Sequence, residues 1–188
     1  MEALKYEDHY TYRDYCTWDD SDRWELIDGL PYAMAPAPSI GHQSILVKLV
    51  TQLAVLLDGK PCKVLAAPTD VRLNADSSDD TVVQPDILVV CDRTKLEDGK
   101  SVVGAPDLII EILSPSTAKH DMLTKKRLYQ KSGVREYWIV DPDSKAVAVN
   151  VLHNGRYNSR FFDERDTAVP VEVLDGCTIN FTDVFEAL

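Results

Sequence analysis

Two short apolar runs, each carrying a carboxylate, constrain the fold of this chain most strongly. Residues 81–92 read TVVQPDILVVCD, and residues 105–114 read APDLIIEILS. Short apolar runs rich in Val, Ile and Leu are typical of strands that are buried on both faces of a sheet. Because alternate residues of a strand share a face, Glu111 is a carboxylate within a strand that otherwise reads as core, and Asp86 is in the same position. An unpaired buried carboxylate costs several kcal/mol, so both are expected to be paired, protonated or bound to a metal.

The segments around these runs predict one α/β domain with a mixed sheet flanked by helices. Residues 39–57 have apolar side chains at steps of three and four, which predicts a helix with Ser39 as its N-cap and Gly59 just past its end. Asp28-Gly29, between two apolar runs, predicts a β-hairpin.

Further elements follow from the same patterns. Residues 63–73 are expected to form one strand interrupted by Pro68, and residues 93–104 a loop. A second helix is expected over 121–133, ended by Gly133, followed by three strands and a last short strand and helical turn near the C-terminus.

The division of the chain is predicted to be simple. Residues 1–22 are polar and are expected to form an N-terminal arm or short helix, with Thr11 as its N-cap. Residues 23–188 are expected to form a single domain, since no internal repeat, low-complexity tract or linker interrupts them.

The charge of the chain opposes a simple nucleic-acid-binding interpretation. Its 31 acidic and 20 basic residues give a net charge of −11, whereas a nucleic-acid-binding protein usually carries a basic footprint. Three interpretations stay open: some acids are metal ligands, the basic residues gather on one face, or the substrate is not a nucleic acid. The net charge alone does not decide among these interpretations, because the local electrostatic field at a binding surface matters more than the total charge of the chain.

The cysteines and the hydropathy pattern favour a cytoplasmic protein. Cys16, Cys62, Cys91 and Cys177 are scattered without a CxxC motif, and we interpret them as free thiols in a reducing compartment. No stretch approaches the roughly 20 apolar residues of a membrane helix, and the N-terminus lacks the features of a signal peptide. The sequence therefore predicts no membrane partner.

Asp86 and Glu111 together predict a site for one divalent cation. They lie 25 residues apart on two predicted neighbouring strands. Mg²⁺ prefers oxygen ligands and keeps several waters, which suits two carboxylates. Such a cation polarises a phosphoryl oxygen and supplies a hydroxide-like nucleophile, and a nearby lysine offsets the developing negative charge. Without metal the two carboxylates are expected to repel, so that Glu111→Gln would stabilise the protein.

Several motifs, in order, resemble the Uma-two family of restriction-endonuclease-like proteins. They are WELIDGLPYAMAP, AAPTDVRL, QPDILVV, GAPDLIIEILSPST, and a D-x3-K-x3-Y pattern followed by GVREYWIVDP. The resemblance runs from about Trp24 to Asp141 and covers most of the chain. The family belongs to the PD-(D/E)xK superfamily, so the resemblance implies a Mg²⁺-dependent DNA endonuclease in which Mn²⁺ can substitute.

The resemblance also implies catalytic residues. Asp86 corresponds to the PD element and Glu111 to the acid of ExK, and both are expected to be metal ligands. The third position of ExK is Leu113 rather than lysine. The family draws its lysine from the next helix, which points to Lys125, with Lys126 as the alternative.

Two upstream residues complete the candidate set. Glu25 resembles the acid of the family that reaches the metal or holds the lysine. His42 is placed to touch a phosphate or the attacking water, and its alternative role is that of an ordinary residue at a helix N-terminus. Asp86 and Glu111 likewise have the alternative of a purely structural ion pair.

Two classes of function remain open at this stage. The first is an active metal-dependent endonuclease that hydrolyses DNA phosphodiester bonds. The second is a catalytically weak or inactive relative that binds DNA or a protein. Cleavage of both strands of a duplex would favour a two-fold homodimer.

Overall fold

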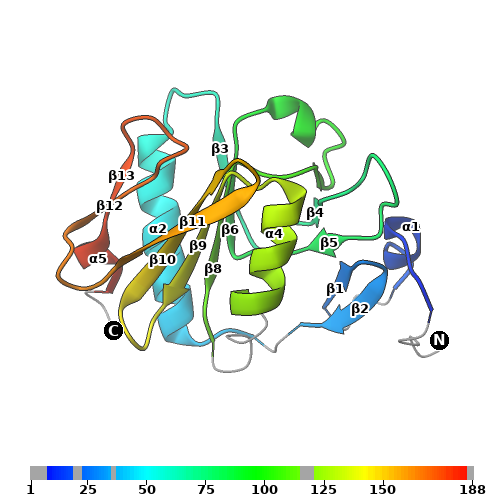
Figure 1. The fold of residues 1–188 in the computed structure, drawn as a ribbon, viewed down its shortest axis with the longest axis horizontal. Coiled ribbons are helices and arrows are strands. Elements are labelled where there is room, and N and C mark those ends of the chain that lie inside the picture. The colour runs from blue at the N-terminus through cyan, green and yellow to red at the C-terminus, as the bar shows by residue number, and fades with distance from the viewer. Residues whose placement is uncertain (1–7, 19–22, 35–36, 115–120, 186–188) are drawn as a thin grey trace.

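A six-stranded mixed sheet forms the centre of the protein, as seen in a computed structural model that describes residues 8–18, 23–34, 37–114 and 121–185 (Figure 1). The strand order is β11-β10-β9-β8-β6-β3, and only β8 and β9 run parallel. The predicted mixed sheet and α/β class are confirmed. The strands are β3 (Lys63–Ala66), β6 (Ile87–Val90), β8 (Leu108–Ile112), β9 (Glu136–Asp141), β10 (Ala146–His153) and β11 (Arg156–Phe162).

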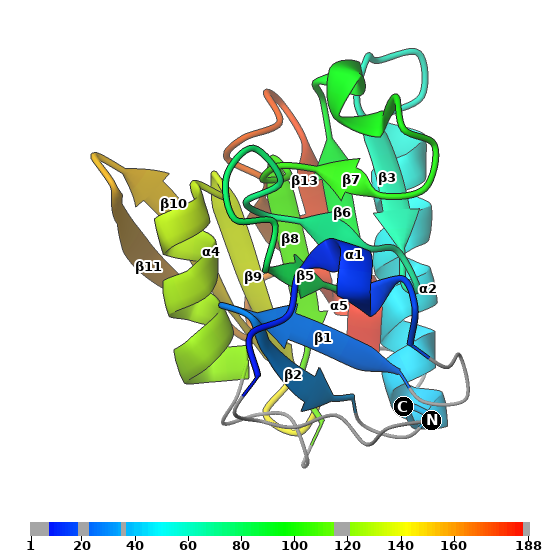
Figure 2. The same ribbon diagram turned by 90° about the vertical axis from the view of Figure 1, so that its right-hand side faces the viewer.

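Two helices cover opposite faces of this sheet (Figure 2). The helix α2 (Ile40–Leu56) begins where the Ser39 side chain accepts a hydrogen bond from the His42 backbone, as predicted. On the other face, a π-helical turn η2 (Asp121–Lys125) runs into α4 (Lys126–Ser132), which ends at Gly133 with φ 84°. The two faces form separate cores: one contains α2 and Ile110, the other α4 and Ile109.

A second sheet packs beside α4, with the order β2-β1-β5-β4-β7. The predicted hairpin is present, since Asp28 and Gly29 have φ of 48° and 77° between β1 and β2. The strands of this sheet are β1 (Trp24–Ile27), β2 (Leu30–Ala33), β4 (Val71–Arg72), β5 (Val82–Val83) and β7 (Val102–Val103).

Two segments expected to be single strands are each divided between the two sheets. Residues 63–73 split into β3 and β4 around the cis peptide bond of Ala67-Pro68. Residues 81–92 split into β5 and β6 at Gln84-Pro85-Asp86. Proline cannot donate to a strand ladder, so each segment leaves one sheet at a proline and enters the other. The predicted loop 93–104 contains a 3₁₀ helix η1 (Arg93–Leu96) and β7.

The ends of the chain pack onto this framework. The short helix α1 (Tyr12–Tyr15) carries a capping box between Thr11 and Asp14, as the sequence predicted for the cap. At the other end, β12 (Ala168–Pro170), β13 (Thr178–Asn180) and α5 (Phe181–Phe185) join the core on the side of α2. The boundary at residue 22 stays a prediction.

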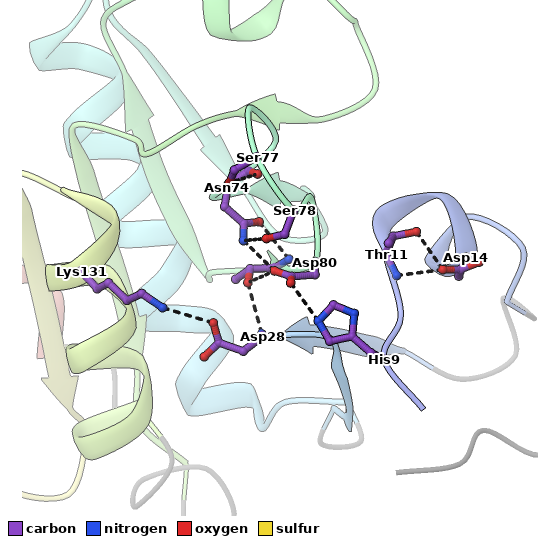
Figure 3. Close-up of polar contacts among 10 residues, drawn as sticks. His9, Thr11, Asp14, Asp28, Asn74, Ser77, Ser78, Asp80 and Lys131 are labelled. Carbon is purple, nitrogen blue, oxygen red and sulfur yellow. Dashed lines mark hydrogen bonds and ion pairs between the residues drawn. The ribbon is translucent and has the colours of Figure 1, made fainter. Parts of the chain in front are cut away.

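Polar contacts tie the arm, the hairpin and α4 together (Figure 3). His9 Nε2 lies 3.0 Å from Asp80 Oδ2, and the His9 ring lies against Gly29. A Cβ at Gly29 would come within 2.3 Å of that ring, so glycine is required there both by contact and by its positive φ. Lys131 Nζ of α4 lies 3.4 Å from Asp28 Oδ1 in the hairpin turn.

The expectation of four free thiols is wrong. Cys62 and Cys91 form a disulfide, whereas Cys16 is exposed, Cys177 is buried, and both are free. The antiparallel pairing of Lys63 with Val90, continued by one residue, places Cys62 opposite Cys91. That juxtaposition depends on the register of β3 and β6, which cysteine spacing does not reveal. No helix in the described residues has the length and apolarity needed to span a membrane.

Glu136 of β9 is a fully buried carboxylate that joins the sheet to the C-terminal segment. Trp138 Nε1 donates to its Oε1 at 2.6 Å, and the Val173 backbone donates to its Oε2 at 2.8 Å. Burial raises the pKa of Glu136 to about 6, although both hydrogen bonds act to lower it. A raised folded-state pKa means that folding favours the protonated acid.

We therefore expect Glu136 to contribute stability that is fully present below its ordinary pKa of 4.5 and lost as pH rises through about 6. Glu136→Gln removes this titration. Urea unfolding of both proteins from pH 4 to 7 should show the wild type losing about 2 kcal/mol relative to the variant across that window. A difference that stays constant with pH would contradict this.

Candidate active site

Asp86 and Glu111 stand opposite one another at one end of the central sheet. The strands β6 and β8 pair Ile87 with Ile110, and the same register continued by one residue sets Asp86 against Glu111. Residues directly opposite in an antiparallel pair share a face, with Cβ atoms roughly 5 Å apart. The Ile112 backbone donates to Asp86 Oδ2 at 2.8 Å, which fixes the Asp86 side chain against β8.

Lys125 reaches this end of the sheet from the helix that follows β8. Its Nζ lies 2.9 Å from Glu111 Oε1 and 3.0 Å from Glu25 Oε1. The side chains of all three residues are only 5–6% exposed. The ammonium group is therefore a buried charge compensated by two buried carboxylates, which is the condition under which such charges are tolerated.

Tyr129, one helical turn beyond Lys125, donates its hydroxyl proton to Glu111 Oε1 at 2.7 Å. Lys125 and Tyr129 share a helix face because they are four residues apart. Burial raises the pKa of Tyr129 well above its ordinary value, and the charges of Glu111 and Glu25 raise it further. The hydroxyl stays protonated and holds Glu111 in place.

Glu25 is positioned from the second sheet. It lies on β1, and the Gln84 backbone donates to its Oε1 at 2.9 Å. The Gln84 side chain in turn donates to Asp70 Oδ1 at 2.9 Å and to the Tyr15 hydroxyl at 3.0 Å. Glu25 thus holds the lysine, one of the two placements expected for it, and its position depends on a network that reaches the N-terminal arm.

The side chain of His42 is buried and contacts Asp86. Its Nε2 lies 3.2 Å from Asp86 Oδ2, and its side chain is 8% exposed. It sits in the first turn of α2, where Ser39 caps its backbone N–H. The side chain therefore joins α2 to the edge of the candidate site, through the carboxylate.

The two candidate lysines occupy different environments. Lys126 is only partly buried, and its Nζ contacts Ser159 Oγ on β11 at 3.1 Å, away from Glu111. Leu113, at the position where ExK would place lysine, packs against the core shared with α4. The position of its ammonium group beside Glu111 therefore favours Lys125 over Lys126 as the lysine of the candidate site.

The sequence did not single out Tyr129 as a site residue, and it assigned no role to Asp70. The four-residue step from Lys125 to Tyr129 could have indicated that Tyr129 reaches the site. Nothing in the sequence indicated a role for Asp70, because Asp70 meets Gln84 only through the packing of the second sheet. Asp121 has no described side chain.

The expected repulsion between Asp86 and Glu111 is offset by neighbours that the sequence did not pair with them. Lys125 and Tyr129 bind Glu111, and His42 and the Ile112 backbone bind Asp86. The expectation that Glu111→Gln stabilises the protein is therefore withdrawn, since the variant would weaken a buried ion pair.

The donor set at this end of the sheet fits a hard divalent cation in part. Among the described residues, no group of three or more His, Cys, Asp or Glu side chains has metal-ligand spacing. Two carboxylate ligands are nevertheless compatible with Mg²⁺, which keeps several waters. Glu25 and Glu111 share the Lys125 ammonium group, and Asp86 contacts His42, so a cation between Asp86 and Glu111 would offset negative charge at this end of the sheet.

A pocket of about 490 Å³ lies elsewhere and contains none of the candidate residues. Its lining includes Asp107 and Arg135, which form an ion pair at 2.9 Å. Asp107 precedes Glu111 by four residues, roughly 13 Å along an extended strand. The candidate site is therefore defined by its charged groups and is separate from this pocket.

A mixed sheet with two carboxylates at the ends of neighbouring strands, and a lysine supplied by the next helix, is the arrangement of a restriction-endonuclease-like protein. The chain belongs to the Uma-two family: the Uma2 family model, described as "Putative restriction endonuclease", matches residues 10–182. The family description supports a nuclease.

Two individual proteins are similar to this chain. An uncharacterized protein of Synechocystis sp. is 32% identical over 145 residues, which cover 74% of this chain and 72% of the relative. The crystal structure of a "putative nuclease belonging to DUF820" from Anabaena variabilis superposes with a TM-score of 0.75 and 23% identity, covering 94% of this chain and 97% of the other. The latter likeness shows the fold.

Burial of Lys125 leads to a stability prediction. Lys125→Met should lower the free energy of unfolding by about 3 kcal/mol at pH 7, because Glu25 and Glu111 lose their shared cation. Lys126→Met, the matched control on the next residue, should change it by less than about 0.5 kcal/mol. Chemical denaturation of both variants measures the difference, and equal effects would show that the buried pairing contributes little.

Proposed function

We propose that the protein is a Mg²⁺-dependent endodeoxyribonuclease that hydrolyses phosphodiester bonds, with Mn²⁺ as a functional substitute. One observation carries the proposal: the Lys125 ammonium is held within 3.0 Å of two buried carboxylates, one of which stands opposite Asp86. Lys125 pairs with Glu25 and Glu111, and Asp86, held by His42, is the further carboxylate with which Glu111 would share a cation. Membership of the Uma-two family supports the same activity.

Asp86 and Glu111 are the residues that would hold the cation. Both described contacts of Asp86, from His42 and the Ile112 backbone, fall on Oδ2. Oδ1 is then the oxygen of Asp86 suited to a ligand. When bound, the cation polarises a phosphoryl oxygen and makes a water more nucleophilic at neutral pH.

The other residues orient this pair and supply charge. Lys125 provides a point charge that offsets the negative charge developing on the phosphate, or that orients the attacking water. Glu25 and Tyr129 hold Lys125 and Glu111 in place, and His42 holds Asp86. We assign His42 a positioning role rather than direct contact with a phosphate.

DNA is the proposed substrate. The cytoplasmic setting stays a prediction, and the Cys62–Cys91 disulfide removes one of the observations on which it was based. A homodimer remains a prediction: two copies related by a two-fold axis would present one site to each strand of a duplex. Sedimentation of the protein with and without duplex DNA tests this point.

The proposed metal site predicts the loss of cation binding in two variants. Asp86→Ala and Glu111→Ala should each abolish Mn²⁺ binding measured by calorimetry, since each removes one of two protein ligands. Asp107→Ala, which changes a carboxylate at the far end of the same strand, is the control and should bind as wild type does. Absence of Mn²⁺ binding in the wild type would favour a catalytically inactive DNA- or protein-binding relative.

The proposed lysine predicts a loss of cleavage. Lys125→Gln should lower plasmid nicking in Mn²⁺ by about 10²–10³-fold, the usual scale for the loss of one transition-state contact. Lys126→Gln should lower nicking far less than Lys125→Gln, because Lys126 does not contact Glu111. Because Lys125 is buried, Lys125→Gln is also expected to destabilise the fold, so nicking must be compared at equal folded fraction, checked by circular dichroism.

If Lys125→Gln nicks plasmid as fast as the wild type, the assignment of Lys125 is wrong. A loss confined to Lys126→Gln would move the role to that residue.

A further inference from the structure

Positively charged residues of this acidic chain are concentrated in one segment of the sequence. Residues 122–162, which include α4, β9, β10 and β11, contain eight basic and three acidic residues, a net charge of +5. The remaining 147 residues contain 12 basic and 28 acidic residues, a net charge of −16. Glu136 of this segment is fully buried, and Lys125 is buried between Glu25 and Glu111. Three more of its bases, Lys131, Arg135 and Arg160, pair with acids from other segments. The bases outside these pairs, among them Lys126, would attract a polyanion.

A row of directly opposed residues runs across the sheet from the candidate site into this segment. Glu111 pairs with Ile139, Ile139 with Ala148, and Ala148 with Phe161. Directly opposed residues share a face, so Phe161 lies on the same face as Glu111. Three strand spacings separate the two, about 14 Å.

Phe161 is an exposed aromatic side chain at the end of this row. It is 77% exposed, although phenylalanine normally lies inside. Ser159, two residues away on the same face of β11, accepts a hydrogen bond from Lys126 of α4. An exposed ring beside a lysine matches the combination by which proteins bind single-stranded nucleic acid, with bases stacking on aromatic groups and phosphates near basic groups.

We infer that Phe161 and Lys126 form a subsite for an unpaired nucleotide of the DNA substrate, so that the protein favours single-stranded DNA, or DNA that is unpaired about four nucleotides from the cleaved bond. The inference rests on the proposed function and adds to that function the class of substrate. The 14 Å separation corresponds to about four nucleotides of a stacked strand. Stacking adds affinity that does not depend on charge, which suits a chain whose net charge is −11.

A second copy of the chain fits this surface less well. The strand β11 is an edge strand of the six-stranded sheet, and edge pairing is a common route to association. It carries exposed Arg156 and Arg160, however, and charged side chains on an edge oppose such pairing. Arg160 pairs with Glu172, and both arginines lie on the face of β11 opposite Phe161, so they are not part of the subsite.

Binding is tested without cleavage, using fluorescein-labelled dT12 and a 12-base-pair duplex in EDTA, followed by fluorescence anisotropy. Phe161→Ala should weaken binding of dT12 by about tenfold and binding of the duplex much less. Phe161→Trp should restore binding of dT12, whereas Phe161→Leu, which keeps apolar bulk, should not. Lys126→Ala should weaken both and lower the salt dependence by about one unit of slope.

Val55 of α2 provides a matched control, because it is 73% exposed and apolar but lies on the helix that covers the other face. Val55→Ala should bind dT12 as the wild type does. The inference is overturned if Phe161→Ala binds dT12 with wild-type affinity, if it weakens the duplex equally, or if sedimentation shows that it only dissociates a dimer. Because the assay is independent of metal and cleavage, it separates this failure from that of the proposed nuclease activity, which Mn²⁺ calorimetry reports.

Discussion

The buried ammonium group of Lys125 is the interaction on which the rest of the candidate site depends. It joins Glu25 of the second sheet to Glu111 of the central sheet, from a helix packed between them. A buried charge is stable only when its partners are held in place, so the two sheets and α4 must be correctly assembled for any of the three side chains to be tolerated. The same contact that brings the site together therefore constrains the packing of the domain.

The prolines explain how one short chain builds two sheets that meet at a site. At Pro68 and at Pro85 the chain leaves one sheet and enters the other, so β4 and β5 belong to the sheet of β1 while β3 and β6 belong to the sheet of β8. The second crossing places Gln84 against Glu25 and, two residues later, Asp86 against Glu111. Proline at these points removes a backbone donor that a continuous strand would need, and the break is where the acids gather.

The charge distribution resolves the conflict between an acidic chain and a polyanionic substrate. Negative charge predominates outside residues 122–162, whereas the segment that carries Lys126 and Phe161 has a net charge of +5. A strongly negative remainder would repel DNA from other faces and so direct it to this one. Metal binding at the carboxylates would reduce the negative charge at the point where a phosphate must approach.

The sequence by itself indicated the helices, the hairpin and most strands of the central sheet, because these follow from local periodicity and turn chemistry. It also pointed to Asp86 and Glu111 as carboxylates in apolar strands, and the family resemblance pointed to Lys125; the roles of these residues are proposals. Only the tertiary structure decided that Glu25 holds the lysine, that His42 contacts Asp86, and that Tyr129 binds Glu111. It also decided the division of two predicted strands between sheets and the pairing of Cys62 with Cys91. These features depend on strand register and on contacts between distant segments, and local sequence patterns contain no information about either.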